Sequence, residues 1–181
     1  MHAYAGPMGI LSFAVGCEAA ASGANQTQWR FCPERWETSA STGGGNGAAP
    51  ARYFSRGLWG TIVFPDETAF LTPALYSQIV TTTPFAPNPL PQTWTKTEAL
   101  KHSVYTIAKG IEAVAANNTY GDCRTAADAI LENAVGLHAQ ILEDEIVLKD
   151  DSAGYQANWR EALRLIAERH QEDFDYLELL G

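Results

Sequence analysis

The chain has 181 residues, of which 46% are apolar, and its 12 basic and 21 acidic side chains give a formal charge of −9. The apolar fraction is enough for a buried core and excludes a wholly disordered chain. The acid excess argues against nucleic-acid binding, which needs clustered lysine and arginine, and no apolar run in the sequence reaches the roughly 18 residues of a membrane span.

An apolar run opens the sequence. Residues 8–17 are similar to the core of a signal peptide, but no basic residue precedes them. The three cysteines, Cys17, Cys32 and Cys123, are an odd number and too scattered for a disulfide framework or a zinc ribbon. We therefore expect the protein in a virion or in the cytoplasm, and not in a secreted form.

The two halves of the chain differ in chemistry. Residues 1–93 hold all nine prolines, four arginines, no lysine and five acids, a net charge of −1, whereas residues 94–181 hold eight bases and sixteen acids, a net charge of −8. We therefore predict an aromatic, loop-rich arm or subdomain over residues 1–93 and an acidic helical part over residues 94–181.

Regular structure in the first half is predicted for short segments. Residues 39–50 (SASTGGGNGAAP) have the composition of a loop. Residues 58–64 are rich in β-branched and aromatic side chains and predict a strand. Thr72 followed by proline predicts a helix over residues 73–80. Four prolines within residues 84–91 exclude helix and predict an extended strap over residues 81–91.

Three amphipathic helices are predicted in the second half. Thr95 and Glu98 match a capping box at the start of the first helix, Asp122 is the expected N-cap of the second, and residues 149–154 separate the second from the third. An apolar stripe follows each helix at spacings of three and four residues. The stripes are Leu100, Val104, Ile107, Ile111 and Val114; then Ala127, Ile130, Leu131, Ala134, Val135, His138, Ile141 and Leu142; then Tyr155, Trp159, Leu163, Ile166, His170, Phe174 and Leu177.

Each helix must bury its stripe, and short polar turns join the three helices. We therefore predict a C-terminal, antiparallel three-helix bundle. Together with the strand of the first half, this gives an α+β fold class, in which an N-terminal β-containing, loop-rich subdomain precedes the bundle.

The sequence holds no Walker loop, dinucleotide-binding glycine pattern or paired zinc-ligand motif, so we predict no cofactor and no metal. His138 and His170 nevertheless lie on apolar stripes, where two facing histidines could share a proton or a metal. Geometry weighs against such a site, because in a hairpin that turns near residue 152 the two would be offset by about 6 Å along the axis and a metal would need two further ligands. Cys123 is expected in the first turn of a helix, where the dipole would lower its pKa.

Aromatic side chains are frequent in the first half and follow no regular period. Because tryptophan and tyrosine dominate interface hot spots, we predict that aromatic residues of the arm contact neighbouring subunits. The candidate interface residues are Trp29, Phe31, Trp36, Tyr53, Phe54, Trp59 and Phe85.

The leading functional prediction is a non-enzymatic structural or assembly subunit, such as a phage virion accessory, adaptor or capsid-associated protein. It would form homo- or hetero-oligomers with protein partners and would bind neither nucleic acid nor membrane. One alternative is a small hydrolase-like enzyme that uses His138 or His170 with carboxylates or Cys123. A second is an acidic regulatory or inhibitory module that binds a basic partner through the last helix, whose acids are Glu168, Glu172, Asp173, Asp175 and Glu178.

Overall fold

The computed structural model describes residues 6–17, 51–148 and 154–170, and its mixture of helices with a small antiparallel sheet confirms the α+β class. Within this part of the chain, no helix combines the length and the apolarity needed to cross a membrane. The elements are η1 (Gly6–Met8), α1 (Gly9–Ala14), β1 (Ala51–Ser55), β2 (Gly60–Phe64), η3 (Thr68–Phe70), α3 (Pro73–Ile79), α4 (Lys96–Ala115), α5 (Tyr120–Glu143) and α6 (Tyr155–Arg169).

Strands β1 and β2 pair as an antiparallel hairpin, with Tyr53 opposite Ile62 and Phe54 opposite Thr61. The predicted strand is confirmed over its last five residues, while Trp59 lies in the hairpin loop with a positive φ of 46°. Because strand side chains alternate between two faces, Tyr53 and Phe54 point to opposite sides of the hairpin. Each side belongs to a different apolar core.

The hairpin therefore separates two cores. We call the first the hairpin core; it includes Tyr53, Leu58, Ile62, Phe64, Leu75, Ile79, Leu90, Trp94, Ala99, Leu137, Ile141 and Ile146. We call the second the helical core; it includes Ile10, Ala14, Phe54, Trp59, Ile107, Val114, Ala127, Leu131, Ala134 and Leu163. Both cores draw residues from both halves of the sequence. The division of the chain into residues 1–93 and residues 94–181 stays a prediction.

The proline-rich segment follows the predicted local structure. Thr72 caps α3, because its hydroxyl oxygen accepts a hydrogen bond from the Leu75 backbone N–H at 3.3 Å. Residues 81–91 contain no helix, as the prolines require. The Trp94 ring N–H donates to the Phe85 carbonyl oxygen at 2.9 Å and so ties the strap to the start of α4.

Helix α4 begins as predicted but buries a different face. The Thr95–Glu98 capping box is present, whereas Leu100 and Val104 of the predicted stripe are 39% and 40% exposed. Ile107 and Val114 are buried as predicted. The other buried residues of α4 are Ala99, His102, Ser103, Thr106 and Gly110.

The small residues on α4 explain this rotation. β1 lies along the helix, and the hairpin can approach the helix closely where small residues such as Ala99, Ser103 and Gly110 lie on the buried face. Gly110 is the clearest case, since a Cβ there would overlap the Trp59 ring. The Trp59 ring N–H donates to the Pro7 carbonyl oxygen at 2.7 Å, so one side chain joins the hairpin loop, α4 and the N-terminal segment.

Helix α5 begins earlier than predicted. Its N-cap is Thr119, whose hydroxyl oxygen accepts from the Asp122 backbone N–H, so Asp122 is the third helical residue and not the cap. Most of the predicted α5 stripe is buried or half-buried, whereas Leu142 is exposed. On α6, Leu163 is buried and Trp159 is half-buried, but Tyr155 and Ile166 lie largely outside the core.

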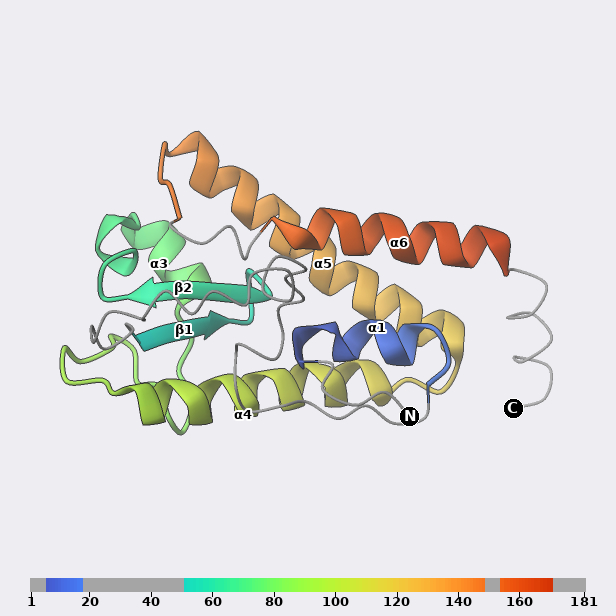
Figure 1. Cartoon of the computed structure of the whole chain (residues 1–181), viewed down its shortest axis with the longest axis horizontal. Helices are drawn as coiled ribbons and strands as arrows, with labels where there is room; N and C mark the ends of the chain where they lie inside the picture. Colours follow the sequence, from blue (N-terminus) through green and yellow to red (C-terminus); the bar gives the residue numbers. More distant parts are fainter. Residues whose placement is uncertain (1–5, 18–50, 149–153, 171–181) are drawn as a thin grey trace, which may run out of the picture.

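The three-helix bundle is not confirmed. Helix α1, which the sequence analysis did not predict, contacts α4, α5 and α6, and Figure 1 shows it between α4 and α6. Helix α4 lies mainly along the hairpin, because its small residues fit β1 better than a second large helix. The helices of the second half therefore enclose an N-terminal segment and do not pack as an isolated bundle.

Candidate functional site

Helix α6 lies against α5, and each of its two exposed sides is a candidate site. Leu163 faces the helical core, and the buried Gln156 amide donates to the carbonyl oxygens of Leu58 and Trp59 at 2.8 and 3.2 Å. These contacts fix the rotation of α6. They leave one side turned towards α5 across a charged groove and the other side turned outwards.

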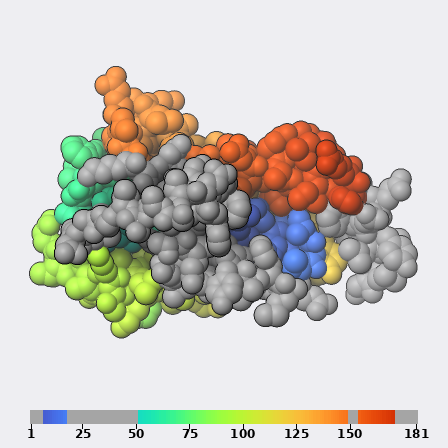
Figure 2. Space-filling view, viewed as in Figure 1, coloured from blue at the N-terminus to red at the C-terminus, as the bar shows by residue number. Residues whose placement is uncertain are grey.

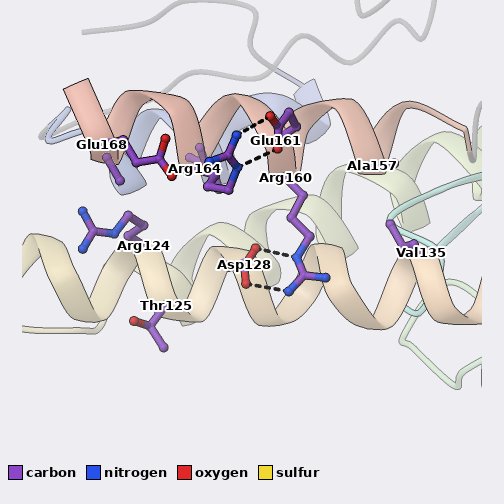
Figure 3. A pocket seen from close by; sticks show the side chains of 11 residues that line it. Arg124, Thr125, Asp128, Val135, Ala157, Arg160, Glu161, Arg164 and Glu168 are labelled. Atoms are coloured by element: carbon purple, nitrogen blue, oxygen red, sulfur yellow. Dashed lines mark hydrogen bonds and ion pairs between the residues drawn. The ribbon is translucent and has the colours of Figure 1, made fainter. Parts of the chain in front are cut away.

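The charged side forms a groove of about 650 Å³ between α5 and α6 (Figure 3). The Arg160 guanidinium donates to both carboxylate oxygens of Asp128, at 2.7 and 3.0 Å, and to Glu132 at 2.8 Å. Bidentate arginine–carboxylate pairs have a defined geometry. This pair therefore sets the antiparallel register of α5 and α6.

A second charge network follows α6 itself. Arg164 bonds both carboxylate oxygens of Glu161 and also pairs with Glu168, and its guanidinium lowers the pKa of Glu161. Since exposed ion pairs contribute little to stability, this ladder mainly orders the groove wall. Glu168 is thus paired within its own helix, and the other acids of the predicted acidic run lie outside the described residues.

The outward side of α6 carries several exposed apolar side chains. Tyr155, Leu165 and Ile166 are 42%, 38% and 37% exposed, and Ala162 is exposed between them. At 3.6 residues per turn, these four residues share one face with the exposed Asn158 and Arg169. An exposed apolar patch rimmed by polar residues is typical of a protein–protein contact.

The predicted interface residues fall into three groups. Tyr53, Phe54 and Trp59 are at most 1% exposed and belong to the two cores, where they stabilise this chain's own fold. Phe85 stays at the surface, where its ring meets the Tyr105 ring edge-on at 6.0 Å. The remaining three, Trp29, Phe31 and Trp36, lie outside the described residues.

The register of α5 and α6 separates the two predicted histidines. The contact of Arg160 with Asp128 and Glu132 shows which residues of the two helices lie opposite each other. From this contact, His138 lies in the direction of the start of α6, whereas His170 lies in the direction of the start of α5. At 1.5 Å per residue, the two are roughly 27 Å apart along the axis. The expected offset of about 6 Å is wrong, because α5 ends at Glu143 and the chain then turns inwards at Ile146.

Cys123 also differs from the expectation. Its thiol is buried and donates to the Val114 carbonyl oxygen at 3.3 Å. Burial raises the pKa of the thiol, with a further contribution from Asp122, so the expected lowering at the helix start does not occur. His138 lies roughly 22 Å further along the same helix, and the structure therefore does not bring these two residues together.

His102, which no sequence pattern indicated, is fully buried on α4. Its Nε2 lies 2.9 Å from the Phe54 carbonyl oxygen and its Nδ1 lies 2.9 Å from the Thr83 hydroxyl. Because a carbonyl can only accept, Nε2 carries the proton and Nδ1 accepts from Thr83. The ring also stacks on Tyr53 at 4.3 Å. The signal that could have found it is its position between Ala99 and Ser103 on the small-residue face of α4.

His102 thus joins β1, the strap and α4, and burial lowers its pKa. Within the described ranges, no group of three or more histidine, cysteine, aspartate or glutamate side chains is placed to hold a metal ion. The chain matches no protein-family model, and neither the curated proteins nor the solved structures compared with it include a match. The groove and the outward face of α6 are therefore the features that bear on function.

Proposed function

We propose that the protein is a structural or assembly subunit that associates with other protein chains through the outward apolar face of α6. This face consists of Tyr155, Ala162, Leu165 and Ile166. The observation that supports the proposal is the exposure of three large apolar side chains along one face of a helix whose rotation is fixed by buried contacts. Burial of such a face is worth about 25 cal/mol per Å² of apolar area.

The order of residues on this face suits pairing with a second copy. Ala162 lies at its centre, and Tyr155 and Arg169 lie seven residues away on either side. A two-fold axis at Ala162 would lay Arg169 over Tyr155 of the partner subunit, a cation–π contact worth about 0.5–1 kcal/mol. The small central side chain would let the two helices approach closely. In this proposal the hairpin and the helices, which share the two cores, together form the body of the subunit.

The proposal is tested by the mass of the purified full-length chain in solution. We expect sedimentation velocity to show species larger than the 19.6 kDa monomer. The double substitution Leu165→Glu and Ile166→Glu should shift the distribution towards the monomer, because it places charges inside the apolar contact.

Phe70→Glu is the matched control, since Phe70 is 69% exposed on η3 and lies outside the α6 face. Circular dichroism should show that all variants retain the wild-type helix content. A wild-type chain that stays at 19.6 kDa at every concentration, or an α6 variant that associates like the wild type, would refute the proposal.

A further inference from the structure

A second apolar patch lies on α4, beside two lysines. We call Leu100 and Val104, with Lys96 and Lys101, the α4 patch. Its two apolar side chains are 39% and 40% exposed. The lysines are exposed one turn before Leu100 and directly after it, and the exposed Glu98 lies three residues before Lys101. The three lysines and two glutamates of α4 give this helix a net charge of +1, although the protein carries a charge of −9.

A third apolar patch lies at the end of α5, and its charged neighbours are acidic. We call residues 142–147 the α5 tip. Leu142 is 58% and Val147 is 83% exposed, and the three carboxylates between them, at positions 143–145, are exposed as well. Ile146 is buried and anchors the tip in the hairpin core. The tip therefore presents its apolar and acidic groups on a fixed support.

The acidic groups of the α5 tip are costly for the chain itself. The C-terminal end of a helix carries a partial negative charge, so carboxylates there are unfavourable. Glu145 also has a φ of +58°, in the left-handed region that non-glycine residues seldom adopt. Local helix stability therefore does not explain these residue types, whereas contact with a basic surface would.

The α4 patch and the α5 tip are complementary. Each has two exposed apolar side chains; the α4 patch adds two lysines, with Glu98 near one of them, and the α5 tip adds three carboxylates. Figure 1 shows the end of α5 and the helix α4 on opposite sides of the hairpin. In the space-filling view, the end of α5 projects at the top, and α4 with the preceding segment lies along the lower left edge (Figure 2). The two patches of one copy therefore face away from each other.

We infer that the α5 tip of one copy docks on the α4 patch of a second copy, in a head-to-tail contact. This inference rests on the proposed function and adds a contact to it. Two different patches of the same chain meet in such a contact, so it repeats from copy to copy and gives a ring or a filament. The α6 face, which pairs by a two-fold axis, would close after two copies.

Charge reversal on each patch tests the inference. Variant A carries Lys96→Glu and Lys101→Glu, and variant B carries Glu143→Lys and Asp144→Lys. Lys96 is the first residue of α4, and residues 143–144 end α5, so three of the four reversals suit the helix dipoles and should not unfold the protein. Each variant alone should assemble beyond the dimer about tenfold more weakly than the wild type, because like charges then face each other.

An equimolar mixture of variants A and B provides the decisive measurement. In the mixture, the unchanged tip of A meets the unchanged α4 patch of B, and the reversed tip of B meets the reversed α4 patch of A. Sedimentation velocity should therefore show that mixing restores the species larger than a dimer. Lys109→Glu on α4 and Glu168→Lys on α6 are matched reversals outside the patches and should leave the association as in the wild type.

Two results would overturn the inference: association of A and B alone at wild-type strength, or a mixture that stays at the mass of the separate variants. If the wild type still associates and only Leu165→Glu with Ile166→Glu disrupts it, the head-to-tail contact is wrong and the α6 contact stands. A wild-type chain that is monomeric throughout overturns both.

Discussion

The hairpin core and the helical core are stabilised by different means. In the helical core, α1, α4, α5 and α6 pair their own backbone groups and contribute apolar side chains. In the hairpin core, polar side chains bond backbone carbonyl groups at the end of α3 and in the strap that follows it. The Tyr53 hydroxyl bonds the Thr81 carbonyl oxygen at 3.0 Å, and the Ser55 hydroxyl donates to the Ile79 carbonyl oxygen at 2.9 Å.

This difference shows how buried backbone groups are satisfied outside regular structure. A helix needs only its own sequence to pair its N–H and C=O groups, whereas the strap after α3 needs partners that are distant in the chain. The hairpin core should therefore depend on single polar contacts. The helical core should depend on the fit of large side chains, and above all on Trp59, which is buried there.

The largest effect is expected at Trp59. Trp59→Ala should lower the free energy of unfolding by about 3–5 kcal/mol, because it leaves a cavity among the hairpin loop, α1 and α4.

Gly110→Ala alone should lower the free energy of unfolding by about 1–3 kcal/mol, since its Cβ would overlap the Trp59 ring. Urea unfolding followed by circular dichroism measures both changes.

The double variant checks whether the ring and the glycine act together. With Trp59 replaced by alanine, Gly110→Ala should cost nothing and should even add some stability, because alanine favours helix over glycine by about 1 kcal/mol. Additive losses in the double variant would mean that Gly110 is not held small by the Trp59 ring.

A smaller difference is expected between two residues of α6. Leu163→Ala should cost about 2–4 kcal/mol, since Leu163 is buried in the helical core. Ile166→Ala should cost less than about 1 kcal/mol, since Ile166 lies on the outward face. Thermal melts of the two variants, recorded at dilutions where the chain is monomeric, give the comparison. Equal losses would place both residues on one buried stripe, as the sequence pattern alone predicts.

Local signals in the sequence predicted the ends and the types of several elements. The capping box at Thr95, the Thr72–Pro73 start of α3 and the exclusion of helix from residues 81–91 all depend on neighbours within four residues. The structure confirms each of them. These features are predictable because the backbone groups and the side chains that satisfy them are close in the sequence.

Long-range packing decided what the sequence pattern could not. Periodicity on α4 favours Leu100 and Val104, but the close approach of the hairpin and its loop selects the small residues Ala99, Ser103 and Gly110 instead. Nothing near His102 in the sequence indicates that Phe54 and Thr83 would become its partners. On α6 the periodicity favours Ile166, but α1 packs against α4, α5 and α6 and Ile166 stays 37% exposed.

The smallest expected effect is a dependence of stability on pH that originates in the hairpin core. Burial of His102 lowers its pKa in the folded chain, whereas in the unfolded chain it titrates near its ordinary value of about 6.5. Between these two values the unfolded state binds more protons. The free energy of unfolding therefore falls as the pH drops below about 6.5, by at most about 1.4 kcal/mol per pH unit, and is level above it.

His102→Leu separates this effect from other titrating groups. The variant loses the bonds to Phe54 and Thr83, so it should be less stable than the wild type at neutral pH by about 1–3 kcal/mol. It has no imidazole to protonate, and the difference between the two proteins should therefore shrink as the pH falls from 7 to about 5.5. Urea unfolding across this range measures the difference directly. A constant difference would mean that His102 takes up its proton equally well in the folded chain, and the hairpin core would then tolerate a buried charge between β1 and the strap.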